Sequence, residues 1–259
     1  METAGLAPRD AGVRLYVFAH AGGSGLMFQD WPARFPSGWR VTAVDAPGHG
    51  TLMRQPPLTD GDALVGHFLD RLGPELDGCE APFAFFGHSM GALVAYELTR
   101  RLLAGGRTAP VWLGLSACGA PRPDAPPVPI RTNELSDEEL RRRVARLGGT
   151  PAKVLDHPGL WRHFAPVIRA DLRLVESWRP APAGTLLPVP VSVFGGARDE
   201  AVGLDGLTRW AQRCERILAV HVFPGGHFYF RNDLRVVADA VVTGIDTALR
   251  TPSAPLAGR

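Results

Sequence analysis

Short and nearly continuous apolar runs recur along this chain, and turn residues bound each of them. Apolar runs of this length are typical of strands that are buried on both faces, as in a parallel sheet. The pattern predicts six strands, over residues 13–19, 39–45, 82–86, 111–117, 189–194 and 217–223.

Longer segments between these runs carry apolar residues at helical spacing. The clearest are residues 62–76 and residues 90–104, and Gly105 and Gly106 end the second one. Two further helices are predicted over residues 204–214 and 233–248. Strands that alternate with helices predict a doubly wound α/β fold around a mostly parallel sheet.

Residues 121–185 interrupt this alternation, because they contain helical patterns but no convincing strand. After a proline-rich stretch, Ser136 and Glu139 match a capping box, which predicts a helix start. A second helix is predicted to begin near Pro158. A helical insertion of this kind is expected over the carboxyl ends of the strands, where ligands bind. We interpret it as a lid, and a helical decoration remote from any site is the alternative.

The chain is therefore divided into three parts. Residues 1–120 and 186–250 are expected to form the core, and residues 121–185 the helical lid. Residues 251–259 are rich in Pro, Ala and Gly and are expected to form a flexible tail.

The strongest chemical signal is the pentapeptide from Gly87 to Gly91, with Ser89 at its centre. A predicted strand precedes it and a predicted helix follows it, which is the context that a G-x-S-x-G nucleophile elbow requires. Such a turn aims the serine hydroxyl into the crevice at the edge of the sheet. The alternative is a glycine-flanked serine in an ordinary turn between a strand and a helix.

A serine hydroxyl needs an adjacent base to act as a nucleophile. In enzymes built on such an elbow, the acid and the histidine follow the serine along the chain. His227 lies in a glycine-rich loop just after the last predicted strand, and it is our candidate base. Of the other histidines after Ser89, two lie in the lid and His221 lies within a strand.

Asp199 is the candidate acid, because it follows the strand over residues 189–194 at the carboxyl edge of the sheet. A carboxylate there can hold the imidazole in its productive tautomer. Glu200 is adjacent and is the main alternative. Some hydrolases place the acid one strand earlier, where this chain has no carboxylate before Asp124.

Two backbone amides are candidates for an oxyanion hole. The loop after the first strand, residues 18–24, is built largely of small residues that leave amides exposed. The amides of Ala21 and Met90 are the natural pair. His20 is expected to brace this loop rather than to act as a second base.

Composition and charge exclude several other classes of protein. The formal net charge is +2 from 28 basic and 26 acidic residues, and Lys153 is the only lysine. We interpret the arginine excess as a coding bias of a GC-rich genome, and the interspersed acidic residues argue against nucleic-acid binding. The three cysteines form no CxxC pair, which argues against a disulfide framework and a zinc site.

The sequence shows no motif for nucleotide binding or for targeting. Gly22 and Gly23 are not followed by the Gly-Lys-Ser/Thr of a phosphate loop, so we expect no nucleotide site. No cluster of His, Cys and Asp has metal-ligand spacing, so we expect no metal. No apolar run reaches the roughly 18 residues that span a bilayer. The first ten residues lack a signal-peptide pattern. We therefore expect a cytoplasmic protein.

Several motifs occur together and in a characteristic order. They are His20-Ala-Gly-Gly-Ser24, Pro47-Gly-His-Gly50, Phe86-Gly-His-Ser-Met-Gly-Ala92, Arg169-Ala-Asp-Leu172 and Gly225-Gly-His-Phe228. With them the chain resembles the type II, or editing, thioesterases of polyketide and non-ribosomal peptide assembly lines. The resemblance covers roughly residues 14–249.

This resemblance implies an α/β-hydrolase fold with a mobile helical lid. It implies hydrolysis of acyl groups on the phosphopantetheine arm of an acyl- or peptidyl-carrier protein, without a cofactor. The catalytic residues of the family map onto Ser89, Asp199 and His227, and its oxyanion amides onto Ala21 and Met90. His49 is a departure, since the family commonly has arginine there.

Three rival functions stay open at this point. The chain could be a discrete thioesterase or cyclase that releases a finished product, or a small-molecule carboxylesterase. A non-catalytic binding protein with a hydrolase fold is disfavoured by the intact order of Ser, Asp and His. Oligomeric state does not follow from the sequence, and a monomer is favoured.

Overall fold

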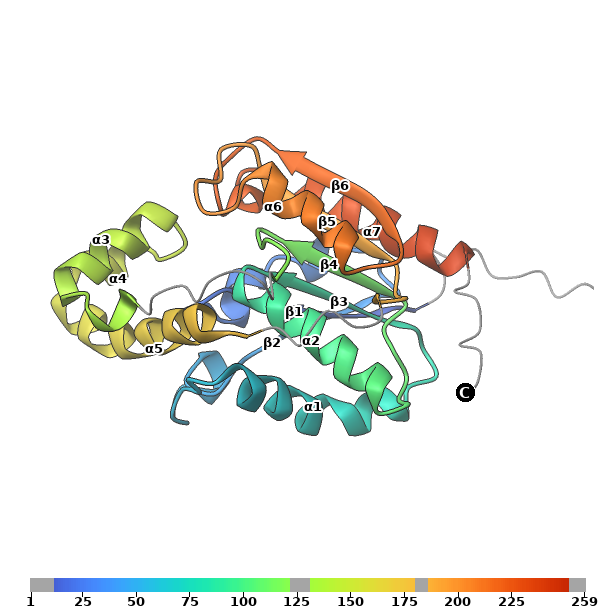
Figure 1. Ribbon diagram of the computed structural model, residues 1–259, viewed down its shortest axis with the longest axis horizontal. Helices are drawn as coiled ribbons and strands as arrows, with labels where there is room; N and C mark the ends of the chain where they lie inside the picture. The colour runs from blue at the N-terminus through green and yellow to red at the C-terminus, as the bar shows by residue number, and fades with distance from the viewer. Residues whose placement is uncertain (1–11, 122–130, 180–185, 252–259) are drawn as a thin grey trace, which may run out of the picture.

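The computed structural model describes residues 12–121, 131–179 and 186–251. Six strands form one sheet in the order β2-β1-β3-β4-β5-β6, and every neighbouring pair is parallel. The predicted doubly wound α/β fold is therefore confirmed (Figure 1). The strands are β1 (Arg14–Phe18), β2 (Arg40–Val44), β3 (Phe83–His88), β4 (Trp112–Ser116), β5 (Val191–Gly196) and β6 (Ile217–Phe223).

Helices cover both faces of the sheet, which explains why most strands are apolar throughout. On one face, α1 (Gly61–Asp77) and α2 (Met90–Ala104) bury their apolar stripes in a core with α6 (Leu204–Thr208). On the other face, α7 (Leu234–Arg250) packs with the aromatic side chains of the first 3-10 turns. Strands β3, β4 and β5 are fully buried, whereas the edge strand β6 is partly exposed.

One predicted helix differs from the structure. Residues 204–214 were expected to be one helix, but α6 ends at Thr208 and a 3-10 turn, Arg209–Gln212, follows. Within this tighter turn Trp210 is fully buried, and its indole N–H donates to the carbonyl oxygen of Cys118 at 2.8 Å. Apolar periodicity alone does not distinguish the two kinds of helix.

The segment interpreted as a lid contains three helices, α3 (Asp137–Leu147), α4 (Ala152–Asp156) and α5 (Pro158–Ser177). The capping box at Ser136 and Glu139 is present. The short α4 was not predicted, because five residues carry too little periodicity. The three helices lie together at one end of the molecule (Figure 1). They share a small core of their own, made of Leu140, Val144, Trp161, Ala165, Ile168 and Leu172.

Two expectations fall on residues that the structure does not describe. Most of the proline-rich stretch, residues 122–130, and of the tail, residues 252–259, lie outside the described residues. Within the described part of the chain, no helix is long and apolar enough to cross a membrane.

Candidate active site

Ser89 occupies the turn between β3 and α2, as the sequence predicts. Its backbone has φ 56° and ψ −116°, a conformation that residues other than glycine rarely adopt. The flanking glycines permit this turn, since a Cβ at Gly87 would lie 2.1 Å from the carbonyl oxygen of Gly91. A Cβ at Gly91 would lie 2.2 Å from the carbonyl oxygen of Phe18, at the end of β1. The strained turn therefore packs directly against the backbone at the end of β1, with no room for a side chain at either glycine.

Asp199 and His227 lie side by side at the carboxyl edge of the sheet. Asp199 follows β5 and His227 follows β6, and Nδ1 of His227 lies 2.8 Å from Oδ2 of Asp199. The other carboxylate oxygen of Asp199 accepts from the amides of Ala201 and Val202, at 2.9 and 3.2 Å. The Asp199 side chain is only 1% exposed. Because a carboxylate accepts, Nδ1 carries the proton and Nε2 is left free to accept one.

The glycine-rich turn before His227 is packed closely against β5. A Cβ at Gly196 would lie 2.1 Å from the carbonyl oxygen of Gly226. The ring centroid of His227 lies 5.2 Å from that of His88, the residue immediately before Ser89. Three segments far apart in the sequence, those around Ser89, Asp199 and His227, thus meet at one place.

The two candidate oxyanion amides lie on segments that approach each other. The close contact of Gly91 with the end of β1 brings the first turn of α2 beside the loop that contains Ala21. In that loop the amide of Gly22 donates to Asp171, and the amide of Gly23 donates to the carbonyl oxygen of His20. Among the described residues, no acceptor is bonded to the amide of Ala21 or Met90. Both N–H groups are therefore available to a ligand.

Buried and uncharged histidines surround His227. Burial, together with the positive charges that His227 and His49 can carry, lowers the pKa of His20 to about 3. Burial also places the pKa of His88 well below its ordinary value. Nδ1 of His88 lies 2.8 Å from Oγ of Ser116, which lies 2.7 Å from the hydroxyl of Tyr229. That His20 braces the loop stays a prediction, because among the described residues no partner is bonded to its buried Nδ1.

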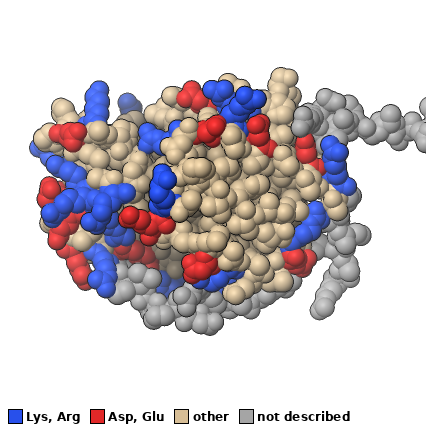
Figure 2. All heavy atoms as spheres, turned by 90° about the horizontal axis from the view of Figure 1, so that it is seen from above, with Lys and Arg blue, Asp and Glu red and all other residues tan. Residues whose placement is uncertain are grey.

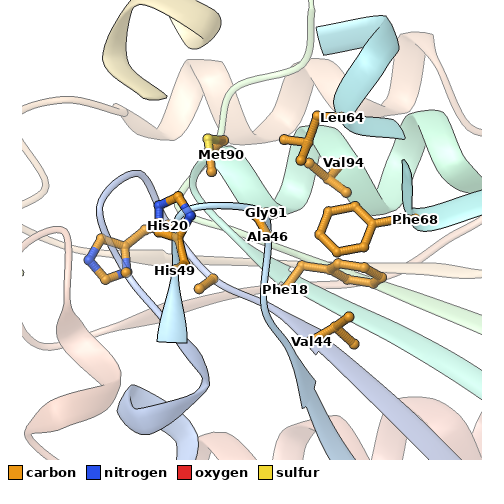
Figure 3. Close-up of a pocket in the computed structure, with 12 residues that line it drawn as sticks. Phe18, His20, Val44, Ala46, His49, Leu64, Phe68, Met90, Gly91 and Val94 are labelled. Carbon is orange, nitrogen blue, oxygen red and sulfur yellow. The ribbon is translucent and has the colours of Figure 1, made fainter. Parts of the chain in front are cut away.

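An apolar pocket lies beside these residues, between the sheet and helices α1 and α2. Figure 3 shows His20 and His49 at one end of the pocket and the Phe18 and Phe68 rings at the other. Met90 and Ala46 also line the pocket. The Pro47–Gly50 turn therefore borders the pocket, and it contributes His49.

The helical segment covers the site from the side of His227. A Cβ at Gly149, just after α3, would lie 2.1 Å from the ring of Phe228. The guanidinium of Arg231 donates to the carbonyl oxygen of Gly148 at 3.2 Å. The segment after α3 thus contacts the residues that follow β6, at the carboxyl edge of the sheet.

The sequence analysis missed the role of one residue, Asp171 of α5. Asp171 is buried, and its carboxylate contacts both His49 and the amide of Gly22. A signal was present, since Asp171 stands in the apolar stripe of its helix beside Ile168 and Leu172. A carboxylate in such a stripe is buried, and a buried carboxylate has partners.

Within residues 12–121, 131–179 and 186–251, no group of three or more His, Cys, Asp or Glu side chains could hold a metal ion.

The parallel sheet and the strained serine turn define an α/β hydrolase, and comparison with known proteins identifies the family. The family model described as "Thioesterase domain" matches residues 13–248. The chain therefore belongs to the thioesterase family, whose members hydrolyse thioesters. The resemblance drawn from its motifs is confirmed.

Individual relatives agree with this assignment. The chain is 31% identical, over 85% of its length and 83% of the relative, to the gramicidin S biosynthesis protein GrsT of Aneurinibacillus migulanus. The type II thioesterase BorB from the borrelidin cluster has a similar structure, with TM-score 0.79, 30% identity and coverage of 90% and 93%. ClbQ from the colibactin pathway is also similar, with TM-score 0.84, 28% identity and coverage of 92% and 99%.

Proposed function

We propose that this thioesterase hydrolyses acyl groups from the phosphopantetheine arm of a carrier protein through an acyl-enzyme on Ser89. The observation that carries the proposal is the hydrogen bond between His227 and Asp199 at the sheet edge where Ser89 stands on its strained turn. The relatives named above support the proposal, since they belong to gramicidin S biosynthesis, the borrelidin biosynthetic cluster and the colibactin NRPS/PKS pathway.

The first half of the reaction transfers the acyl group to the enzyme. Nε2 of His227 takes the proton of the Ser89 hydroxyl as Oγ attacks the thioester carbonyl carbon. Asp199 holds the imidazole in the correct tautomer and stabilises the imidazolium. The C–S bond breaks, and the imidazolium of His227 gives its proton to the departing sulfur, which leaves neutral His227 ready for the second half. The sulfur departs easily because the pKa of an ordinary thiol is about 8.5.

The second half returns the enzyme to its starting state. A water molecule gives its proton to His227 and attacks the acyl-Ser89 carbonyl carbon. The C–Oγ bond breaks, Ser89 recovers its proton from His227, and the carboxylic acid leaves. The amides of Ala21 and Met90 donate to the oxyanion in both halves, and no cofactor takes part.

The apolar pocket supports an acyl substrate. Its Phe18, Leu64, Phe68 and Val94 side chains offer no hydrogen-bonding partner, so they suit a hydrocarbon chain. We assign the enzyme an editing role in the cytoplasm, where it removes stranded acyl groups. Two alternatives are a product-releasing thioesterase and a carboxylesterase. They can be distinguished from an editing enzyme by comparing short acyl-carrier, long acyl-carrier and simple ester substrates.

The lid offers a basic surface to an acidic carrier protein. Arg142 and Arg146 are one helical turn apart on α3, and both are exposed. Their neighbour Arg143 is engaged within the lid, where it pairs with Glu176 at 2.8 Å. Figure 2 shows basic and acidic side chains intermixed at this end of the molecule, so the surface is not uniformly positive.

We expect kcat/KM to be higher for an acyl-carrier protein than for the same acyl group on a minimal thiol. The double variant Arg142→Glu/Arg146→Glu should narrow that difference and leave the minimal-thiol rate unchanged. The reason is that electrostatic steering acts on association and weakens with salt. The measurement is kcat/KM on both substrates at low and high salt.

A matched control is Arg40→Glu/Arg250→Glu, which changes the net charge equally. Both residues are exposed, at the start of β2 and the end of α7, the edge of the sheet away from the lid. This control should keep the full preference for the carrier. Equal efficiency of the wild type on both substrates at low salt would contradict recognition of the carrier.

The lid should also open more readily than the core. Most of its buried apolar side chains form a small cluster of their own, and of the buried lid residues only Leu174, near the end of α5, belongs to a large cluster beside the sheet. Among the described residues, fewer buried contacts therefore hold the lid than hold the core. We expect amide hydrogen exchange in α3, α4 and α5 to be faster than in β3 and β4, with opening on the μs–ms scale. Exchange in these helices as slow as in the central strands would argue against a mobile lid.

A further inference from the structure

Asp171 connects helix α5 with two loops beside the candidate oxyanion hole. Its Oδ2 lies 2.6 Å from the amide nitrogen of Gly22 and 2.7 Å from Nε2 of His49. The Asp171 and His49 side chains are 3% and 4% exposed. A single carboxylate oxygen therefore accepts from the loop after β1 and from the turn after β2, with little competition from water.

The contacts of His49 indicate that its ring carries two protons. Nε2 faces the Asp171 carboxylate, and Nδ1 lies 3.0 Å from the carbonyl oxygen of Pro47. Both of these oxygens only accept, so each ring nitrogen must donate. Burial lowers the pKa of His49, but the hydrogen bond and charge of Asp171 outweigh it, and the pKa is raised overall.

The other charged groups around His49 are few. His20, from the loop after β1, faces it and is neutral for the reason given above. Asp45 precedes the same turn, but its carboxylate accepts from the amides of Gly25 and Thr51. Helix α1 presents apolar side chains to the pocket that His49 lines. Asp171 is thus the counter-ion of His49.

We propose that Asp171 and His49 are positioning residues that hold the oxyanion hole in its active geometry when the lid helix α5 is docked. The proposal rests on the function proposed above, because it concerns the amide of Ala21. Asp171 fixes the Gly22 amide, which belongs to the peptide unit directly after Ala21. His49 holds the carboxylate in place.

Two further contacts support the coupling between α5 and this loop. Gly22 has φ +76°, and a Cβ there would lie 2.6 Å from Cγ1 of Ile168, one helical turn before Asp171. Ala21 itself packs against the apolar cluster of the lid. When α5 leaves, the loop loses the Asp171 hydrogen bond and these packing contacts together. The oxyanion hole is then formed only under a closed lid.

The protonation of His49 gives the coupling a pH dependence. A histidine whose pKa is raised in the folded protein contributes its full stabilisation when the pH is below its ordinary pKa of about 6.5. The contribution is lost as the pH rises through the raised pKa. The value of kcat should therefore fall on the alkaline side of the pH profile as His49 loses its proton.

Substitutions at these two residues test the proposal on a minimal substrate, acetyl-N-acetylcysteamine. Asp171→Ala should lower kcat by about 100-fold, since misplacing one oxyanion donor costs about that much, and should leave KM nearly unchanged. The matched control is Glu176→Ala, which breaks a buried ion pair inside the lid, away from the loop. The control should lose far less of kcat.

His49→Arg provides the second measurement, because arginine keeps its charge at every pH used. The alkaline fall in kcat should be absent from His49→Arg and present in the wild type and in Glu176→Ala. Equal loss of kcat in Asp171→Ala and Glu176→Ala, or an alkaline fall that persists in His49→Arg, would overturn the proposal. The Ser89→Ala variant separates the two proposals. If Ser89→Ala keeps its turnover, the proposed function fails. If Ser89→Ala is inactive and Asp171→Ala is fully active, only the positioning role fails.

Discussion

Replacing Ser89 by alanine should leave a folded protein that has lost nearly all thioester hydrolysis. Loss of the nucleophile of a triad costs on the order of 10⁴ to 10⁶ in rate, because the remaining groups only bind and polarise the substrate. The measurement is single-turnover hydrolysis of an acyl-pantetheine by freshly purified protein. It is compared with the wild-type rate under the same conditions.

The control for this variant is its thermal unfolding midpoint. Ser89 has positive φ, and alanine tolerates that conformation no better than serine does, so the midpoint should change little. Substantial turnover by a clean Ser89→Ala preparation would show that another group attacks the thioester.

Asp199→Asn should lower kcat by about 10⁴-fold. One oxygen of Asp199 accepts from two backbone amides, so the asparagine oxygen will stay there. The new NH2 group then takes the place of Oδ2, opposite Nδ1 of His227. It donates to Nδ1, which moves the imidazole proton to Nε2, the atom that must accept the proton of Ser89.

Glu200→Gln is the matched control, since it makes the same chemical change one residue away. Glu200 is exposed, whereas the Asp199 side chain is nearly fully buried against His227. The Glu200 variant should keep close to full activity. A large loss in Glu200→Gln together with a small loss in Asp199→Asn would identify Glu200 as the acid.

Much of the fold could be predicted from the sequence, because its signals are local. The bounds predicted for the helix over residues 90–104 and the strand over residues 217–223 match α2 and β6. The apolar run marks the strand, and Gly105 and Gly106 mark the end of the helix. Helix α4 and the 3-10 turn after α6 were missed because short helices depend on tertiary contacts.

The site was partly predictable for the same reason. Ser89, Asp199 and His227 each follow a recognisable strand, and parallel strands end at one edge, so their convergence could be foreseen. The contact between His49 and Asp171 joins residues 122 positions apart, and no local pattern encodes their separation in space. The contacts of His20 and His88 with Phe228 likewise join residues far apart in the sequence.

The central claim is that the enzyme removes acyl groups from a carrier protein. The most direct test offers it the same short acyl group as an acyl-carrier thioester and as a simple oxygen ester, with a long-chain acyl-carrier alongside. Intact-mass spectrometry follows the loss of the acyl group from the carrier. We predict that the short-chain carrier returns to its free-thiol mass well before the oxygen ester is consumed, and that it stays acylated with Ser89→Ala. Rapid hydrolysis of the oxygen ester while the carrier keeps its acyl group would contradict the proposal and identify a carboxylesterase.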